Sequence, residues 1–253
     1  MSEESRTIPT DHRRIGPDGA GRRRAVPTLL SAVTHWIKSA GVAFVLFLII
    51  RAFLVEAFKI PTGSMENTLL TGDFLLVNKV LFGAEVPGTG LRLPALRDPR
   101  REDVIVFNPP HDPERSYVKR LVGVPGDILE MHGKVLHLNG VQVAEPYARY
   151  VDRFGDAVHP SMNWQAHHLI ASTHRGYHPS RDNWGPLVVP EGRFFVLGDN
   201  RDNSEDSRYW GFVERSAIHG RPWFVYFSFD AAALAYAPWS AAVRWDRAGK
   251  TIR

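Results

Sequence analysis

A single serine, Ser64, stands in the segment 60–65 (Ile-Pro-Thr-Gly-Ser-Met), directly after the only long apolar run of the chain. A serine hydroxyl is a weak nucleophile and needs a base within hydrogen-bond reach. No His, Asp or Glu lies in a familiar local arrangement with Ser64, and the Gly-x-Ser-x-Gly pattern of lipases is absent. A lysine, Lys119, follows in the strand-like run 115–123. These two residues are the candidate nucleophile and base for acyl transfer.

Lys119 can act as a base only if it is neutral at working pH. A free lysine has a pKa of about 10.4, so it must be desolvated or placed near positive charge. Strand alternation puts Lys119 on the face of Tyr117 and Leu121 and puts Arg120 on the other face, which predicts an apolar setting. The alternative is an exposed strand lysine that discourages edge pairing, and this segment alone favours that alternative.

A dense polar segment, 198–208, contains three aspartates, two arginines and two serines. Taken alone it is typical of a solvated or calcium-binding loop, because Asp199, Asp202 and Asp206 could supply oxygen ligands. The terminal glutamate spacing of an EF-hand is missing. His174 and His178 have the i, i+4 spacing of zinc ligands on a helix, but Gly and Pro residues around them disfavour a helix. We therefore predict no metal site and no cofactor.

Composition narrows the class of protein. The chain has 253 residues, 44% of them hydrophobic, which is enough to bury a sizeable core. Without cysteine it can form no disulfide, thiolate nucleophile or thiolate metal site. The net charge is +4, but the Lys and Arg residues do not interleave with aromatics, so no nucleic-acid partner is predicted. Six arginines fall within the first 24 residues, which indicates membrane topology instead.

The N-terminal part divides into a tail and an anchor. Residues 1–28 are polar and lack periodicity, which predicts a disordered tail that the positive-inside rule keeps in the cytoplasm. Residues 29–55 are mostly apolar and predict one transmembrane helix near 32–54, with Lys38 and Arg51 extending towards the headgroups. The alternatives are a tail that binds acidic surfaces, a buried soluble helix, and a cleavable signal peptide.

Residues 56–253 predict a mainly β domain. Strands are expected at 73–79, 103–107, 192–197 and 222–229, with a strong hairpin signal at Asn139-Gly140 and a weaker one at His132-Gly133. No alternation of helices and strands appears, so an antiparallel architecture is favoured over a doubly wound fold. The irregular stretch of about 146–184 is interpreted as an inserted β/loop region, and Ala231–Ala237 as a short helix.

Together, the serine segment, the lysine strand and the polar segment resemble the bacterial type I signal peptidases (leader peptidases). These are membrane-bound serine proteases with a Ser-Lys dyad. The resemblance spans roughly residues 51–230 and rests on Pro-Thr-Gly-Ser-Met, Tyr-Val-Lys-Arg and Gly-Asp-Asn-Arg-Asp-Asn-Ser. Thr62 stands where many members have serine, and it keeps the hydroxyl.

The resemblance implies roles for further residues. Thr62 and the Ser64 N–H would bind the oxyanion, and Ser204 would hydrogen-bond and orient Lys119. Asp199 with Arg120, and Asp206 with Arg208, would form structural ion pairs. The implied substrate pocket comprises Phe58, Ile60, Met65, Leu69, Leu75, Val106, Tyr117 and Val118, although each of these residues is also of a type that any β core would bury.

The implied activity is removal of N-terminal signal peptides, with cleavage after small residues of the Ala-x-Ala type. The implied site of action is the inner (cytoplasmic) membrane, with a single-pass anchor, the N-terminus in the cytoplasm and the catalytic domain on the outer, periplasmic side. Partners would be signal-peptide-bearing preproteins, membrane lipid and the export machinery. Two alternatives are a related Ser-Lys processing protease of narrower substrate range and a non-catalytic, membrane-tethered peptide-binding β domain.

Overall fold

The computed structural model describes residues 29–85, 89, 91–153, 155–156, 158–170, 176–230, 232–233 and 242–252. The expected tail 1–28, the zinc-spaced His174 and most of the expected helix Ala231–Ala237 lie outside the described residues. The chain forms two compact units, Met1–Val45 and Leu46–Arg253. Each unit is described by itself.

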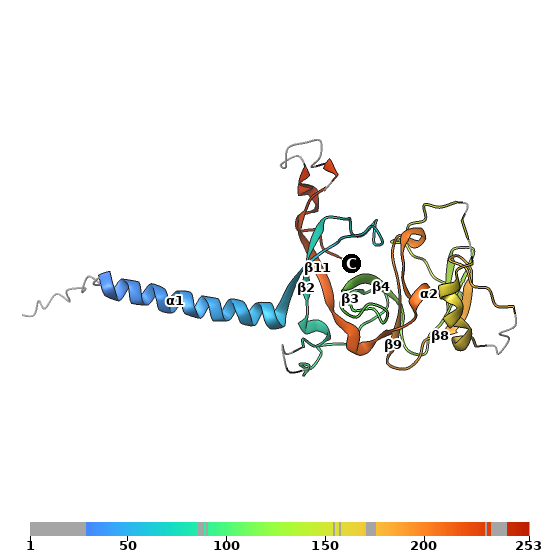
Figure 1. Cartoon of the computed structure of the whole chain (residues 1–253), viewed down its shortest axis with the longest axis horizontal. Coiled ribbons are helices and arrows are strands. Elements are labelled where there is room, and N and C mark those ends of the chain that lie inside the picture. Colours follow the sequence, from blue (N-terminus) through green and yellow to red (C-terminus); the bar gives the residue numbers. More distant parts are fainter. Residues whose placement is uncertain are drawn as a thin grey trace, which may run out of the picture. The chain divides into compact units, whose positions relative to one another are not determined.

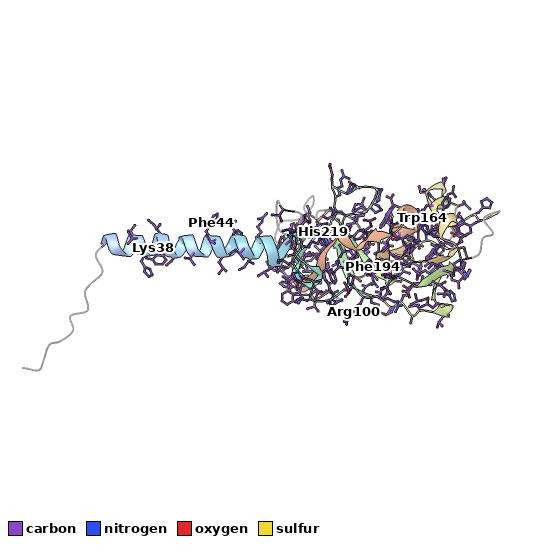
Figure 2. The ribbon with its side chains drawn as sticks, turned by 90° about the horizontal axis from the view of Figure 1, so that it is seen from below. Lys38, Phe44, Arg100, Trp164, Phe194 and His219 are labelled. Atoms are coloured by element: carbon purple, nitrogen blue, oxygen red, sulfur yellow. The ribbon has the colours of Figure 1, made fainter. Side chains whose placement is uncertain are left out.

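Helix α1 (Leu29–Ile49) covers most of the expected anchor. Lys38 and Phe44 project outward from it, and the Phe44 side chain is 61% exposed (Figure 2). A π-helical turn, Ile50–Leu54, follows. Among the described residues, no helix combines the length and the apolarity needed to cross a bilayer.

A seven-stranded antiparallel sheet dominates the second unit (Figure 1). Its strand order is β1-β2-β11-β3-β4-β9-β10, and every neighbouring pair is antiparallel. The prediction of a mainly antiparallel β fold is therefore confirmed. The strands are β1 (Val55–Lys59), β2 (Asp73–Asn78), β3 (Val104–Phe107), β4 (Tyr117–Gly123), β9 (Arg193–Leu197), β10 (Val213–Glu214) and β11 (Ile218–Ser228).

A second, four-stranded sheet has the order β7-β6-β5-β8. Its strands are β5 (Ile128–His132), β6 (Val135–Leu138), β7 (Val141–Gln142) and β8 (Trp184–Val188). Both expected hairpins are present: φ is 54° and 73° at Gly133 and Lys134, and 53° and 78° at Asn139 and Gly140. Positive φ at both central residues is the signature of the type I′ turn, which suits the twist of two-residue hairpins.

The sequence analysis did not identify β8, because Gly185 and Pro186 interrupt it. Proline is tolerated there because β8 is an edge strand of its sheet. Within the stretch 146–184, the described residues include a 3-10 helix, Pro160–His168, that precedes β8. The chain returns through β9 to the large sheet, and a short helix, α2 (Ser207–Trp210), follows the polar segment.

Three hydrophobic clusters hold the second unit together. The cluster that joins the two sheets packs Val122, Phe195 and Leu197 of the large sheet against Leu129 and Trp184 of the smaller one. A second cluster includes Ile60, Met65 and Leu69 from the loop after β1, together with residues of β2, β3, β4 and β11. Burial of these three loop side chains anchors the loop that carries Ser64.

Candidate active site

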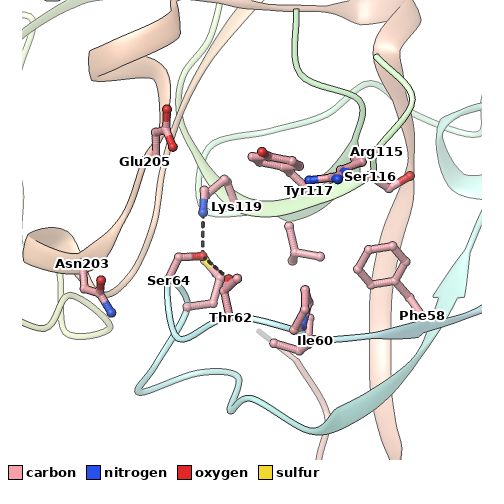
Figure 3. A pocket seen from close by; sticks show the side chains of 13 residues that line it. Phe58, Ile60, Thr62, Ser64, Arg115, Ser116, Tyr117, Lys119, Asn203 and Glu205 are labelled. Carbon is pink, nitrogen blue, oxygen red and sulfur yellow. Dashed lines mark hydrogen bonds between the residues drawn. The ribbon is translucent and has the colours of Figure 1, made fainter. Parts of the chain in front are cut away.

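Ser64, on the loop after β1, and Lys119, on β4, meet beside the large sheet. Lys119 comes from β4, and its Nζ donates a hydrogen bond to Ser64 Oγ at 2.6 Å (Figure 3). Lys119 is 4% exposed, so the exposed-lysine alternative is wrong. Its setting is buried but not purely apolar, because the charges of Asp206, Arg208, Glu205 and Asp199 act on it. The serine loop is folded tightly around Ser64, because Glu66 N donates to Gly63 O and Leu69 N donates to Met65 O. The candidate nucleophile and the candidate base are thus in hydrogen-bond contact.

Burial lowers the pKa of Lys119 from 10.5 to about 8. Desolvation is the main cause, because the charged ammonium loses its hydration in the protein interior. The negative charges of Asp206, Glu205 and Asp199 raise this pKa, and the positive charge of Arg208 lowers it further. The result is a lysine that is partly neutral near neutral pH and can accept a proton.

Two groups near Ser64 could stabilise an oxyanion. Thr62 Oγ1 lies 3.5 Å from Ser64 Oγ. The backbone N–H of Ser64 donates no hydrogen bond to any described residue, so it is free for a ligand. These are the two donors that the sequence implied.

Both ion pairs implied for the polar segment are formed. Arg120 Nε and Nη2 donate to Asp199 at 2.8 and 2.7 Å. Arg208 Nε and Nη2 donate to Asp206 at 2.8 Å each, and Asp206 also accepts from Gly198 N at 3.0 Å. Basic side chains thus engage all three aspartates weighed as calcium ligands, because Lys134 Nζ donates to Asp202 at 2.6 Å and Arg181 Nε lies 3.4 Å from it. These carboxylates hold the loop in place.

Ser204 does not take the expected role. Its Oγ is buried and finds no hydrogen-bond partner among the described residues, so the bond to Lys119 is not formed. The Lys119 amine is directed at Ser64 instead, and the Ser204 side chain packs closely against Gly198. A Cβ at Gly198 would also lie 2.5 Å from the Ser64 carbonyl oxygen. The absence of a side chain at Gly198 therefore permits close contact between the polar segment and the nucleophile.

A cavity of about 520 Å³ opens beside the Ser64 and Lys119 side chains (Figure 3). Five of the implied pocket residues line it: Phe58, Ile60, Met65, Tyr117 and Val118. The other three, Leu69, Leu75 and Val106, do not; they lie in the hydrophobic core, at 0%, 0% and 4% exposure. For these three, core packing is the correct interpretation.

The sequence analysis missed several residues of this cavity. Pro61, Arg115, Ser116, Asn203 and Glu205 also line it. All five lie in or beside the three motifs, so proximity to the motifs was the available signal. In Figure 3, Glu205 lies near Lys119, and Phe58 lies on the opposite side of the dyad.

The sequence analysis also missed the residues that connect the polar segment to the serine loop. Asn200 Nδ2 donates to Gly63 O at 3.1 Å, and Asn200 N donates to Ser64 O at 3.1 Å. Arg201 forms a buried ion pair with Glu145 at 2.6 Å. No periodic pattern marks such contacts, because they join loops far apart in the sequence.

Comparison with known proteins agrees with this arrangement. The model of the family described as signal peptidase, peptidase S26, matches residues 33–227. A signal peptidase I of Pseudomonas fluorescens is 38% identical, covering 79% of this chain and 75% of the relative. A signal peptidase I of Pseudomonas aeruginosa is 37% identical with the same coverage. One of Buchnera aphidicola is 32% identical, covering 85% of this chain and 82% of the relative.

The match and the site define a peptidase. The chain belongs to the signal peptidase family, peptidase S26.

Proposed function

We propose that this protein removes N-terminal signal peptides from exported preproteins, with Ser64 as nucleophile and Lys119 as general base and acid. The observation that carries the proposal is the 2.6 Å hydrogen bond between a buried lysine of lowered pKa and a cavity-lining serine. The family and its relatives, which are described as signal peptidase I, support the choice of substrate.

The reaction begins with neutral Lys119, whose Nζ accepts the hydroxyl proton as Ser64 Oγ bonds to the scissile carbonyl carbon. The carbonyl oxygen gains negative charge, which the Ser64 N–H and the Thr62 hydroxyl stabilise. The C–N bond then breaks, and Lys119 returns the proton to the departing amine. Water, deprotonated by Lys119, attacks the acyl-enzyme; its O–C bond forms, the Ser64 ester bond breaks, and Ser64 regains a proton.

The cavity suits an extended peptide with small side chains before the cut. Phe58, Ile60, Met65 and Val118 supply apolar walls beside the nucleophile. A cavity of about 520 Å³ has room for small residues on an extended strand. The choice of Ala-x-Ala segments rests on the resemblance to the signal peptidases.

The proposed setting is the inner membrane. The arginine-rich tail and the apolar run that follows it in the sequence support a single-pass anchor with the N-terminus in the cytoplasm and the catalytic domain on the outer side. Contact with membrane lipid and with the export machinery follows from that setting. Protease added outside spheroplasts should degrade the chain after Arg51 and spare the tail; protection of the catalytic domain would contradict this orientation.

The function is tested by incubating the purified full chain in detergent with a precursor that carries a signal peptide. Wild type should release the mature protein, and Ser64→Ala should not. Ser216→Ala is the matched control, since this serine lies outside the catalytic cavity and should leave cleavage intact. Peptide binding without cleavage by wild type would favour the non-catalytic alternative. Cleavage of only one precursor in a varied panel would favour the narrower protease.

A further inference from the structure

The peptide between Gly63 and Ser64 is held from the polar segment by one side chain. Asn200 Nδ2 donates to Gly63 O at 3.1 Å, and the same nitrogen donates to Glu66 Oε2 at 3.2 Å. Asn200 is 2% exposed, so water does not compete for these contacts. Its own backbone N–H donates to Ser64 O at 3.1 Å. Asn200 therefore contacts the chain on both sides of the nucleophile.

The contact with Gly63 O fixes the direction of the next N–H. A trans peptide is planar, so the C=O of Gly63 and the N–H of Ser64 point in opposite directions from one rigid plane. A donor that holds the oxygen on one side thereby aims the N–H to the other side. That N–H donates to no described residue, and Ser64 lines the cavity. The Gly63–Ser64 peptide plane is thus oriented so that the Ser64 N–H can donate to a bound carbonyl.

The orientation of the Asn200 amide is itself fixed. Arg149 Nη1 donates to Glu66 Oε2 at 2.5 Å, so the carboxylate that accepts from Asn200 is held in turn. Gly63 O also accepts from Glu66 N at 3.1 Å, which is a turn contact of the serine loop. This second contact remains when the Asn200 side chain is removed, so the loop retains its turn and loses only the outer restraint on the plane.

From this geometry we infer that Asn200 is a positioning residue for the oxyanion donor, acting through the Gly63–Ser64 peptide plane. The inference rests on the proposed function and adds a residue that touches neither the substrate nor the reacting atoms. Such a restraint matters most when charge develops on the carbonyl oxygen, because preorganised donors act chiefly in the transition state. Removing it should lower kcat and leave KM nearly unchanged.

The test uses Asn200→Ala in the full chain in detergent. Loss of an oxyanion donor itself costs on the order of 10² to 10³ in rate, so loosening a donor that remains should cost about tenfold in kcat. A substrate-derived peptide aldehyde probes the same step: Ser64 Oγ bonds to its carbonyl carbon, Lys119 takes the proton, and the oxygen becomes an oxyanion. Its inhibition constant should rise about tenfold, while that of the corresponding peptide alcohol stays within about twofold.

Two further variants separate positioning from folding. Glu66→Ala frees the Asn200 amide and should produce a smaller loss in the same direction, a few-fold in kcat and aldehyde affinity. Asn67→Gly is the matched control: its Nδ2 donates to Tyr147 O at 3.0 Å from the same loop but outside the Ser64 plane, and its φ of 96° suits glycine. It should change aldehyde affinity by less than about threefold.

The outcomes are distinct. A loss of aldehyde affinity that exceeds the loss of alcohol affinity, with an unchanged pH profile, supports the inference. Equal losses for aldehyde and alcohol, or a shifted pH profile, would show that Asn200 merely supports the general structure of the site. Failure of wild type to cut any precursor would instead contradict the proposed function.

Discussion

Lys119→Met should stabilise the protein while abolishing activity. Lys119 is held at a pKa of about 8, against 10.5 for the unconstrained side chain, chiefly by burial. Below pH 8 both folded and unfolded chains carry the proton, and the folded state bears the full desolvation cost. Each pKa unit is worth about 1.4 kcal/mol, so the shift corresponds to a destabilisation of about 3 kcal/mol near pH 7.

The pH dependence of this stability contribution is opposite in sign to that usually expected for a hydrogen-bonded lysine. Because the folded pKa is lowered, the cost grows as pH falls from 10.5 to about 8 and then stays constant. Near pH 9.5 it should be about half as large, and above the unfolded pKa it should vanish. Methionine also loses the hydrogen bond to Ser64 Oγ, which costs about 1 kcal/mol at every pH. The net gain should therefore be about 2 kcal/mol near pH 7 and close to zero near pH 9.5.

The assay is denaturant unfolding of the full chain in detergent, followed by tryptophan fluorescence at both pH values. Lys134→Met is the control, because it removes ion pairs to Asp182 and Asp202 and should destabilise at both pH values. The reasoning is refuted if Lys119→Met changes the free energy of unfolding by the same amount at the two pH values, or if it destabilises near pH 7.

Substitutions at three other residues test separate parts of the site. Thr62→Val should lower kcat about a hundredfold with little change in KM, whereas Thr62→Ser should keep most activity; a wild-type kcat for valine would exclude the Thr62 hydroxyl as a donor. Asp199→Asn removes the carboxylate charge that faces the buried Arg120 and should cost about 3 to 5 kcal/mol of stability, measured by thermal unfolding, and a cost below about 1 would contradict the buried pair. Glu205 is exposed on the cavity wall, so its charge should favour substrates with Lys rather than Glu after the cut. Glu205→Gln should reduce this preference, measured as a ratio of kcat/KM values at low salt, by about threefold. An unchanged ratio would exclude Glu205 from substrate contact.

Much of the fold followed from local patterns. The strands β2, β3, β4, β9 and β11 lie where runs of apolar residues predicted them. Burial alternates along β2, whereas β3, β4 and β9 are buried on both faces. Strand β1 was not recognised, since it directly follows the apolar run and has only five residues. Interrupted by Gly185 and Pro186, β8 lacks the pattern of a central strand.

The contact between Ser64 and Lys119 was predictable, whereas its surroundings were less so. Ser64 and Lys119 stand in distinctive motifs, but Leu69, Leu75 and Val106 have the same apolar character as true cavity residues, so their place in the core depends on tertiary packing. The failure of Ser204 to reach Lys119 depends on side-chain directions that spacing does not specify. Contacts such as Asn200 with Gly63 join loops 137 positions apart and leave no local signal.

The most direct test of the account is the pH dependence of kcat/KM for cleavage of one signal-peptide-bearing precursor by the full chain. If neutral Lys119 accepts the Ser64 proton, kcat/KM should rise about tenfold per pH unit below its pKa of about 8 and level off above it. A profile that is flat through this range, or that already levels off near pH 6, would contradict the role of Lys119 as the base.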